Sequence, residues 1–149
     1  MRAITYIIND PVNVCDIVTL ILEYITLGNC VCEDIIFEIK VILNELIVNA
    51  LQHGNKCNVN KCTHVTFKII ENYLYVSVVD EGSGFNHTKT AFVNKELDCA
   101  NNLYYDHGRG LVIVRQLCDK MKFNKCGNKV SIIKNIYLQQ PNNVEKIKE

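Results

Sequence analysis

Residues 45–55 read Glu-Leu-Ile-Val-Asn-Ala-Leu-Gln-His-Gly-Asn and close a long apolar repeat that begins near residue 32. Apolar residues recur there at helical spacing, which predicts a helix over residues 32–52 that Gly54 ends. The opposite face of this helix would carry Glu45, Asn49, Gln52 and His53. A carboxylate and an amide one turn apart can serve a hydroxyl nucleophile and a Mg²⁺ ion, because Mg²⁺ prefers hard oxygen ligands. A solvated helix face is the plain alternative.

Two strands are predicted downstream of this helix, over residues 64–70 and 73–79. Residues 80–84 follow directly and read Asp-Glu-Gly-Ser-Gly. The carboxylate of Asp80 can accept a hydrogen bond from a donor such as an exocyclic amine, and the glycines allow close approach of the backbone. An ordinary Asp-x-Gly turn would contain the same residues.

A third polar cluster precedes the helix predicted over residues 111–119. Residues 107–110 read His-Gly-Arg-Gly, and glycines at a helix N-terminus expose backbone N–H groups that form an anion site together with the helix dipole. The cluster lacks the Lys-Ser/Thr ending of a P-loop and the glycine pattern of a dinucleotide fingerprint.

The remaining predicted elements are a strand over residues 2–8, a helix over 13–27, a long loop over 85–107, and strands over 121–125 and 129–138. The order β-α-α-β-β-loop-α-β-β predicts an α+β fold. We expect a two-layer sandwich in which a mixed, mainly antiparallel sheet is covered on one face by three helices. Residues 1–138 would form one domain, and residues 139–149 a charged, loose tail.

The composition is that of one ordinary globular domain. The chain has 149 residues, and its 16 basic and 16 acidic side chains give a formal net charge of zero. Direct nucleic-acid binding is therefore not expected, since it depends on excess positive charge. No apolar run approaches the roughly 20 residues that span a bilayer, and no signal peptide is recognised. We expect a cytoplasmic protein that does not enter a membrane.

Eight cysteines are many for such a domain, namely Cys15, Cys30, Cys32, Cys57, Cys62, Cys99, Cys118 and Cys126. We expect most of them to be small buried hydrophobes that stay reduced in the cell. A metal site is the alternative, because His53 and His64 flank the pair Cys57 and Cys62, although the spacing of that pair does not fit a zinc site well.

Together the three polar clusters resemble the GHKL ATPase superfamily, which includes gyrase, heat-shock chaperones, histidine kinases and MutL. Glu45 to Asn49 looks like its N-box, Asp80-x-Gly82-x-Gly84 like its first glycine box, and Gly108-x-Gly110 like its second. Residues 85–107 would be the ATP lid. The small size, the short lid and the run over residues 108–119 look most like the bacterial anti-sigma-factor serine-protein kinases of the sporulation and general-stress type.

The resemblance implies that the chain binds ATP and Mg²⁺, and it assigns roles residue by residue. Asp80 would hydrogen-bond the adenine amino group, and Asn49 would hold Mg²⁺ against the phosphates. Glu45 would be the general base that takes the proton from a substrate serine. The other positions that it places at the nucleotide are His53, Gly54, Gly82, Gly84, Gly108, Arg109, Gly110 and Leu111.

One position departs from the pattern. Related kinases often carry an arginine two residues before the first glycine of the second box, where this chain has Asp106, an acid that would repel a γ-phosphate. Arg109 lies inside the motif and would compensate for it. Without that compensation, the protein would be chiefly a nucleotide-dependent binder.

The partners that the resemblance implies are a sigma factor and a STAS-type anti-anti-sigma protein, with a homodimer as a further expectation. Two alternatives remain open at this stage. One is a stand-alone histidine-kinase-like ATPase module, against which the chain shows no helix with a phospho-acceptor histidine. The other is a non-catalytic module that binds ATP or a metal.

Overall fold

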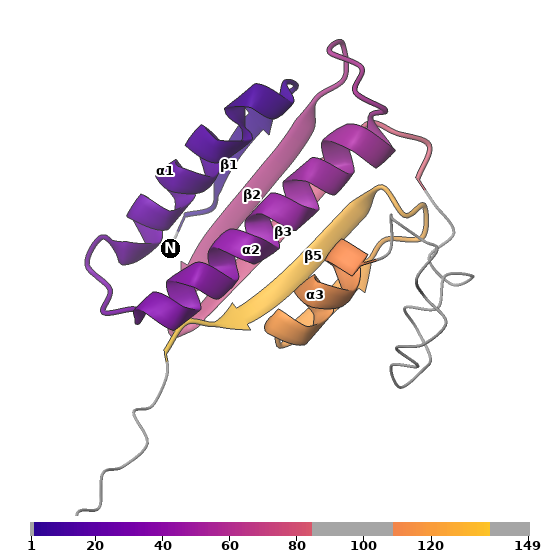
Figure 1. The fold of residues 1–149 in the computed structure, drawn as a ribbon. Coiled ribbons are helices and arrows are strands. Elements are labelled where there is room, and N and C mark those ends of the chain that lie inside the picture. Colours follow the sequence, from indigo (N-terminus) through magenta and orange to yellow (C-terminus); the bar gives the residue numbers. More distant parts are fainter. Residues whose placement is uncertain (1, 85–108, 138–149) are drawn as a thin grey trace, which may run out of the picture.

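The computed structural model describes residues 2–84 and 109–137. In chain order the elements are β1 (Ile4–Ile8), η1 (Pro11–Asn13), α1 (Val14–Thr26), α2 (Glu33–Asn49), η2 (Ala50–Gly54), β2 (Thr63–Ile70), β3 (Tyr73–Asp80), α3 (Arg109–Leu117), β4 (Lys120–Phe123) and β5 (Lys129–Asn135) (Figure 1). The long loop predicted over residues 85–107 and the tail predicted over 139–149 lie outside the described residues.

The five strands form one sheet in the order β1-β2-β3-β5-β4, and all four described pairings are antiparallel. The α+β, two-layer prediction is therefore confirmed, whereas the expected mixture of parallel and antiparallel pairs is absent from the described strands. The reason is the position of β5. Strands β3 and β4 run in the same direction, but β5 turns back from β4 and inserts between them, so no parallel pair forms.

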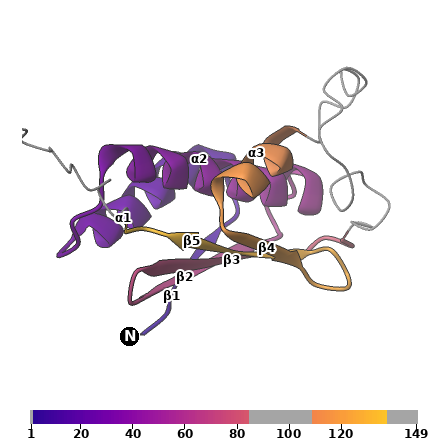
Figure 2. The same ribbon diagram turned by 90° about the horizontal axis from the view of Figure 1, so that it is seen from below.

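All three α-helices cover the same face of the sheet (Figure 2). Helix α2 lies at the centre and buries the stripe predicted from its spacing, including Ile39, Leu43 and Ile47. The sheet presents Phe67 and Ile132 to this layer, each no more than 1% exposed. Fully burying one such side chain stabilises the fold by about 1.5–3 kcal/mol, so the α2–sheet contact is the main source of stability.

Two helix ends differ from the prediction. Helix α2 stops at Asn49 and continues as the π-helical turn η2, in which the N–H of Asn55 donates to the carbonyl of Ala50 over 2.8 Å. Helix α3 begins at Arg109, two residues earlier than expected, and ends at Leu117. π-helical turns within helices occur frequently at functional sites.

The expectation that most cysteines are buried is wrong for the seven that the structure describes, whereas their free thiols agree with the expected reduced state. All seven are free; Cys15, Cys30, Cys32, Cys57 and Cys126 are exposed, and the other two are half-buried. None of the seven is a buried core residue; Cys118 is partly buried against the core, and the others lie in connecting segments or, for Cys15, at an outward helix position. Within residues 2–84 and 109–137 no group of three potential metal ligands comes together, and no helix is long and apolar enough to cross a membrane.

A buried ion pair holds the end of α3. Lys134 points from β5 into the helical layer, where it pairs with Glu38 of α2 and donates a 2.6 Å hydrogen bond to the carbonyl of Leu117. The Lys134 side chain is only 11% exposed. Its charge is thus shared between a carboxylate of one helix and the last carbonyl of another.

We predict that Glu38→Ala lowers the free energy of unfolding by about 1–3 kcal/mol, because it leaves a buried ammonium without its counter-charge while Glu38 itself is partly solvated. Urea denaturation measures the change. The exposed Glu23→Ala on α1 serves as the control and should alter stability by no more than about 0.5 kcal/mol. Equal effects of the two substitutions would show that the pair contributes nothing specific.

Candidate functional site

The first turn of α3 packs directly against the polar face of α2. A β-carbon placed on Gly110 would overlap Oε2 of Glu45 and would lie 3.6 Å from Nδ2 of Asn49. No side chain fits at position 110 without moving the Glu45 carboxylate. The structure therefore brings the pair of Glu45 and Asn49, which the sequence analysis had placed on one helix face, together with Gly110 from the third cluster.

The amide of Asn49 is buried, yet its Nδ2 has no hydrogen-bond partner among the residues described. Leaving a buried polar group unpaired costs about 1–3 kcal/mol. The nitrogen and oxygen of such an amide are assigned from their neighbours rather than observed, so either atom could face a ligand here. An unpaired amide next to a carboxylate and a helix N-terminus fits a site for a metal–phosphate group.

A second cluster lies at the end of β3. The N–H of Gly82 donates a 2.8 Å hydrogen bond to Oδ1 of Asp80. A β-carbon on Gly54 would come within 2.5–2.6 Å of both carboxylate oxygens of Asp80, and one on Gly82 would overlap the carbonyl of Gly54. The three residues thus fit together in this arrangement because two of them are glycines.

Burial raises the pKa of the Asp80 carboxyl above its usual range, although the N–H of Gly82 and the charge of Lys61 act in the opposite direction. The carboxylate is therefore held in a partly desolvated position where its negative charge is disfavoured. Such an arrangement is typical of a group that receives a ligand rather than of one that stabilises the fold.

Asn55 is a site residue that sequence reasoning missed. Its side chain is 1% exposed; Oδ1 accepts a 2.8 Å hydrogen bond from the N–H of Glu81, and Nδ2 donates to Oγ1 of Thr63 over 3.1 Å. It therefore ties the end of η2 to the residue after Asp80. The one available signal was its place directly after the His-Gly pair.

The turn between β4 and β5 supports the same strand end. Asn128 accepts at its carbonyl from the N–H of Asp80 over 3.0 Å and donates from Nδ2 to the Asp80 carbonyl over 3.3 Å. Gly84, at φ +76°, lies so close to the carbonyl of Cys126 that a β-carbon would overlap it. Gly84 thus packs on this turn.

The other predicted positions are less closely defined. His53 and Arg109 are exposed, beside Gly54 and at the start of α3, and Leu111 is half-buried in the first turn of α3. Gly108 and Asp106 lie outside the described residues. The end of α2, the end of β3 and the start of α3 gather at one edge of the molecule (Figure 1).

This combination of an acid and an amide on a central helix, an acid-glycine turn at a strand end, and a glycine-opened helix over an antiparallel sheet defines a GHKL-type ATP-binding domain. The sequence pattern of the histidine kinase-like ATPase domain family matches residues 11–134. The chain belongs to this family.

The chain is similar to the serine-protein kinase RsbW of Staphylococcus aureus strains JH9 and Newman, with 27% identity over 119 residues in each case. The similarity covers 76% of this chain and 75% of the relatives' length. The matched regions thus include nearly all of the described fold.

We predict that Asp80→Asn raises the melting temperature at pH 7 and that this gain shrinks as the pH falls toward 3.8, the ordinary pKa of the group. Because the folded-state pKa is raised, ionisation of Asp80 destabilises the folded protein as the pH rises from 3.8 through the raised pKa. Thermal melts from pH 4 to 7 measure the difference. Glu71→Gln, at an exposed position, is the control. A gain in melting temperature of Asp80→Asn that does not depend on pH would contradict a raised pKa of Asp80.

Proposed function

We propose that the protein is an ATP-dependent serine-protein kinase of the anti-sigma type. It would bind a sigma factor and transfer the γ-phosphoryl group of ATP to a serine of a STAS-type anti-anti-sigma protein. The observation that carries the proposal is the packing of Gly110 against Glu45 beside the unpaired amide of Asn49. The similarity to kinases named as serine-protein kinases supports it.

The cluster around Asp80 is suited to the adenine ring. Its carboxylate can accept a hydrogen bond from the exocyclic amine, and the absence of side chains at Gly54 and Gly82 leaves room for a flat base. A guanine ring would present a carbonyl oxygen at the same place and would be repelled by the carboxylate. This end of the site would therefore select adenine nucleotides.

The start of α3 is suited to the phosphates. Its first N–H groups have no partner within the helix and carry the positive end of the helix dipole. Gly110 keeps this helix end close to α2, Leu111 continues the same turn, and Arg109 adds a positive charge. By resemblance, Gly108 would supply a further N–H group, and Asn49 would hold Mg²⁺. When bound, Mg²⁺ neutralises charge on the phosphates.

Glu45 is the residue that we assign to the proton transfer. The serine Oγ would attack the γ-phosphorus, the bond from that phosphorus to the bridging oxygen of ADP would break, and the serine proton would pass to the Glu45 carboxylate. Its place beside Gly110 puts the acceptor next to the phosphate end. A general base of this kind typically contributes about 10²–10⁴-fold to the rate.

The partners and setting of the protein follow by the same resemblance. We expect binding of the sigma factor and of the anti-anti-sigma protein to depend on the bound nucleotide, which is the usual basis of a partner switch. A homodimer and a cytoplasmic location are part of the proposal. Asp106 is the position that separates an active kinase from a nucleotide-dependent binder, and phosphotransfer assays decide between the two.

We predict that Glu45→Gln reduces phosphotransfer about 10²–10⁴-fold while ATP affinity changes little, because the amide cannot take the proton. Transfer of labelled phosphate to a purified STAS-domain protein and calorimetric ATP titration measure the two quantities. Glu33→Gln, an exposed carboxylate in the first turn of α2, is the matched control. If the Glu45→Gln variant transferred phosphate at the parental rate, Glu45 would not be the general base.

We predict that adding a methyl group at Gly54 and adding one at Gly110 have different effects on nucleotide affinity. Gly54→Ala should weaken adenosine and ATP alike, because it displaces the Asp80 carboxylate. Gly110→Ala should weaken ATP and leave adenosine binding nearly unchanged, because it moves only the phosphate end. Calorimetric titrations with both ligands measure the effects. Equal loss of adenosine and ATP in Gly110→Ala would contradict the assigned orientation of the nucleotide.

A further inference from the structure

The sheet face that the helices leave uncovered has its own chemistry (Figure 2). We call it the outer sheet face. It consists of the outward residues of the strands, which pair across them in four rows: Ile70, Tyr73 and Asn135; Lys68, Tyr75, Ile133 and Lys120; Thr5, Thr66, Ser77, Ser131 and Lys122; and Ile7, His64, Val79 and Lys129. These rows alternate with the buried residues that face the helices.

The charge on the outer sheet face is of one sign. Lys68, Lys120, Lys122 and Lys129 all line it, whereas the strands β1–β5 contain a single carboxylate, Asp80, which lies on the helical side. The whole chain is neutral. The outward residues of the described strands therefore carry positive charge only, which makes this face locally positive.

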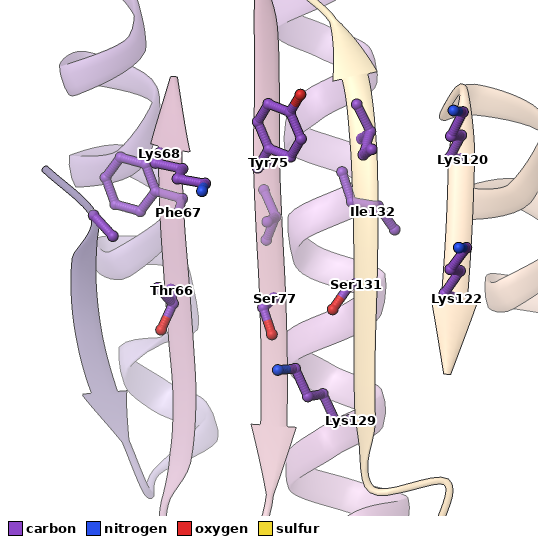
Figure 3. Close-up of a pocket in the computed structure, with 13 residues that line it drawn as sticks. Thr66, Phe67, Lys68, Tyr75, Ser77, Lys120, Lys122, Lys129, Ser131 and Ile132 are labelled. Atoms are coloured by element: carbon purple, nitrogen blue, oxygen red, sulfur yellow. The ribbon is translucent and has the colours of Figure 1, made fainter. Parts of the chain in front are cut away.

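The positive charges flank a strip of hydroxyl groups. Thr66, Ser77 and Ser131 lie side by side on neighbouring strands (Figure 3). Lys122 continues this row on β4, and Lys68 lies two residues along β2 from Thr66. The residues line a hollow of about 520 Å³. Lys68 lies on β2 and Lys122 on β4, and these strands are three strand spacings apart in the sheet. Measured across the strands, the two lysines are therefore about 14 Å apart. This distance is wide enough for one extended polypeptide segment.

We propose that the outer sheet face binds an acidic segment of another protein. Carboxylates on either side of the segment would pair with Lys68 and with Lys120 and Lys122, while the hydroxyl strip exchanges hydrogen bonds with its main chain. This inference goes beyond the proposed kinase activity and does not depend on nucleotide binding, because the face lies across the sheet from Asp80 and Glu45.

The same face is less suited to a nucleic acid. Base stacking needs free aromatic rings. The ring of Tyr75 is covered by Lys68, whose Nζ lies 5.4 Å from its centroid, and Tyr73, which is 39% exposed, does not line the hollow. No arginine lines the hollow, although arginine is the side chain best suited to phosphate recognition. The neutral chain also provides no long-range attraction to a polyanion.

Two other occupants of the outer sheet face are also disfavoured, namely a second copy of this chain and its own C-terminal residues 138–149. A second copy packed face to face would set lysines against lysines, and like charges in a contact are repulsive. The C-terminal residues 138–149 contain two lysines and two glutamates, so they bring no excess negative charge. A separate acidic partner remains the occupant that matches the charge.

The test is binding of fluorescein-labelled poly-L-glutamate to the full chain, followed by anisotropy. We expect Lys68→Glu/Lys122→Glu to weaken binding about tenfold or more, because attractive pairs become repulsive. The control Lys40→Glu/Lys56→Glu changes the net charge equally at exposed positions outside the hollow and should have little effect. Lys68→Gln/Lys122→Gln, which should fold without difficulty, is expected to give an intermediate loss.

Three results would overturn the inference. One is equal weakening by the two Glu double variants, which would show a general charge effect. Another is tighter binding of oligothymidylate than of poly-L-glutamate at the same salt concentration. The third is a dimer of the parent chain, seen by sedimentation, that Lys68→Gln/Lys122→Gln dissociates. Unchanged ATP titration of the variants confirms that the helical side stays folded and separates this inference from the proposed function.

Discussion

The contact between the first turn of α3 and the polar face of α2 governs the candidate site. It exists because position 110 has no side chain, so the backbone of α3 can lie against Glu45 and Asn49. The far end of α3 is fixed by Lys134, which bridges Glu38 and the carbonyl of Leu117. Lys134 thus fixes the C-terminal end of α3, and Gly110 lets its N-terminal end lie against α2. Together the two contacts fix the position of the N-terminus of α3 beside Glu45 and Asn49.

The opposite end of the site, around Asp80, also depends on a close approach of the backbone, which buried hydrogen bonds support. Gly54 and Gly82 surround the Asp80 carboxylate, and Asn55 and Asn128 hold the adjoining backbone from two sides. The free energy that desolvation of Asp80 costs the fold is offset by these contacts and by the apolar core beneath. Asp80 is thus a cost to stability at the position that we propose for the adenine amine.

Much of this arrangement could be predicted from the sequence, because helical spacing and strand composition are local signals. The apolar stripe of α2 and the hairpin of β2 and β3 were confirmed for that reason. The insertion of β5 between β3 and β4 could not be predicted, since it depends on long-range pairing. Asn55 was also missed, because only the folded chain shows that its amide meets Glu81 and Thr63. The exposure of the cysteines likewise depends on tertiary packing.

The π-helical turn η2 sets where the chain leaves the central helix. A π-helical turn accommodates one residue more than an α-helical turn does, so the backbone widens between Ala50 and Gly54. Gly54 then lies against the Asp80 carboxylate, while the side chain of Asn55 reaches Glu81 and Thr63. One local widening of the helix thus sets two contacts with the end of β3, and a substitution that regularised the turn would alter both of them together.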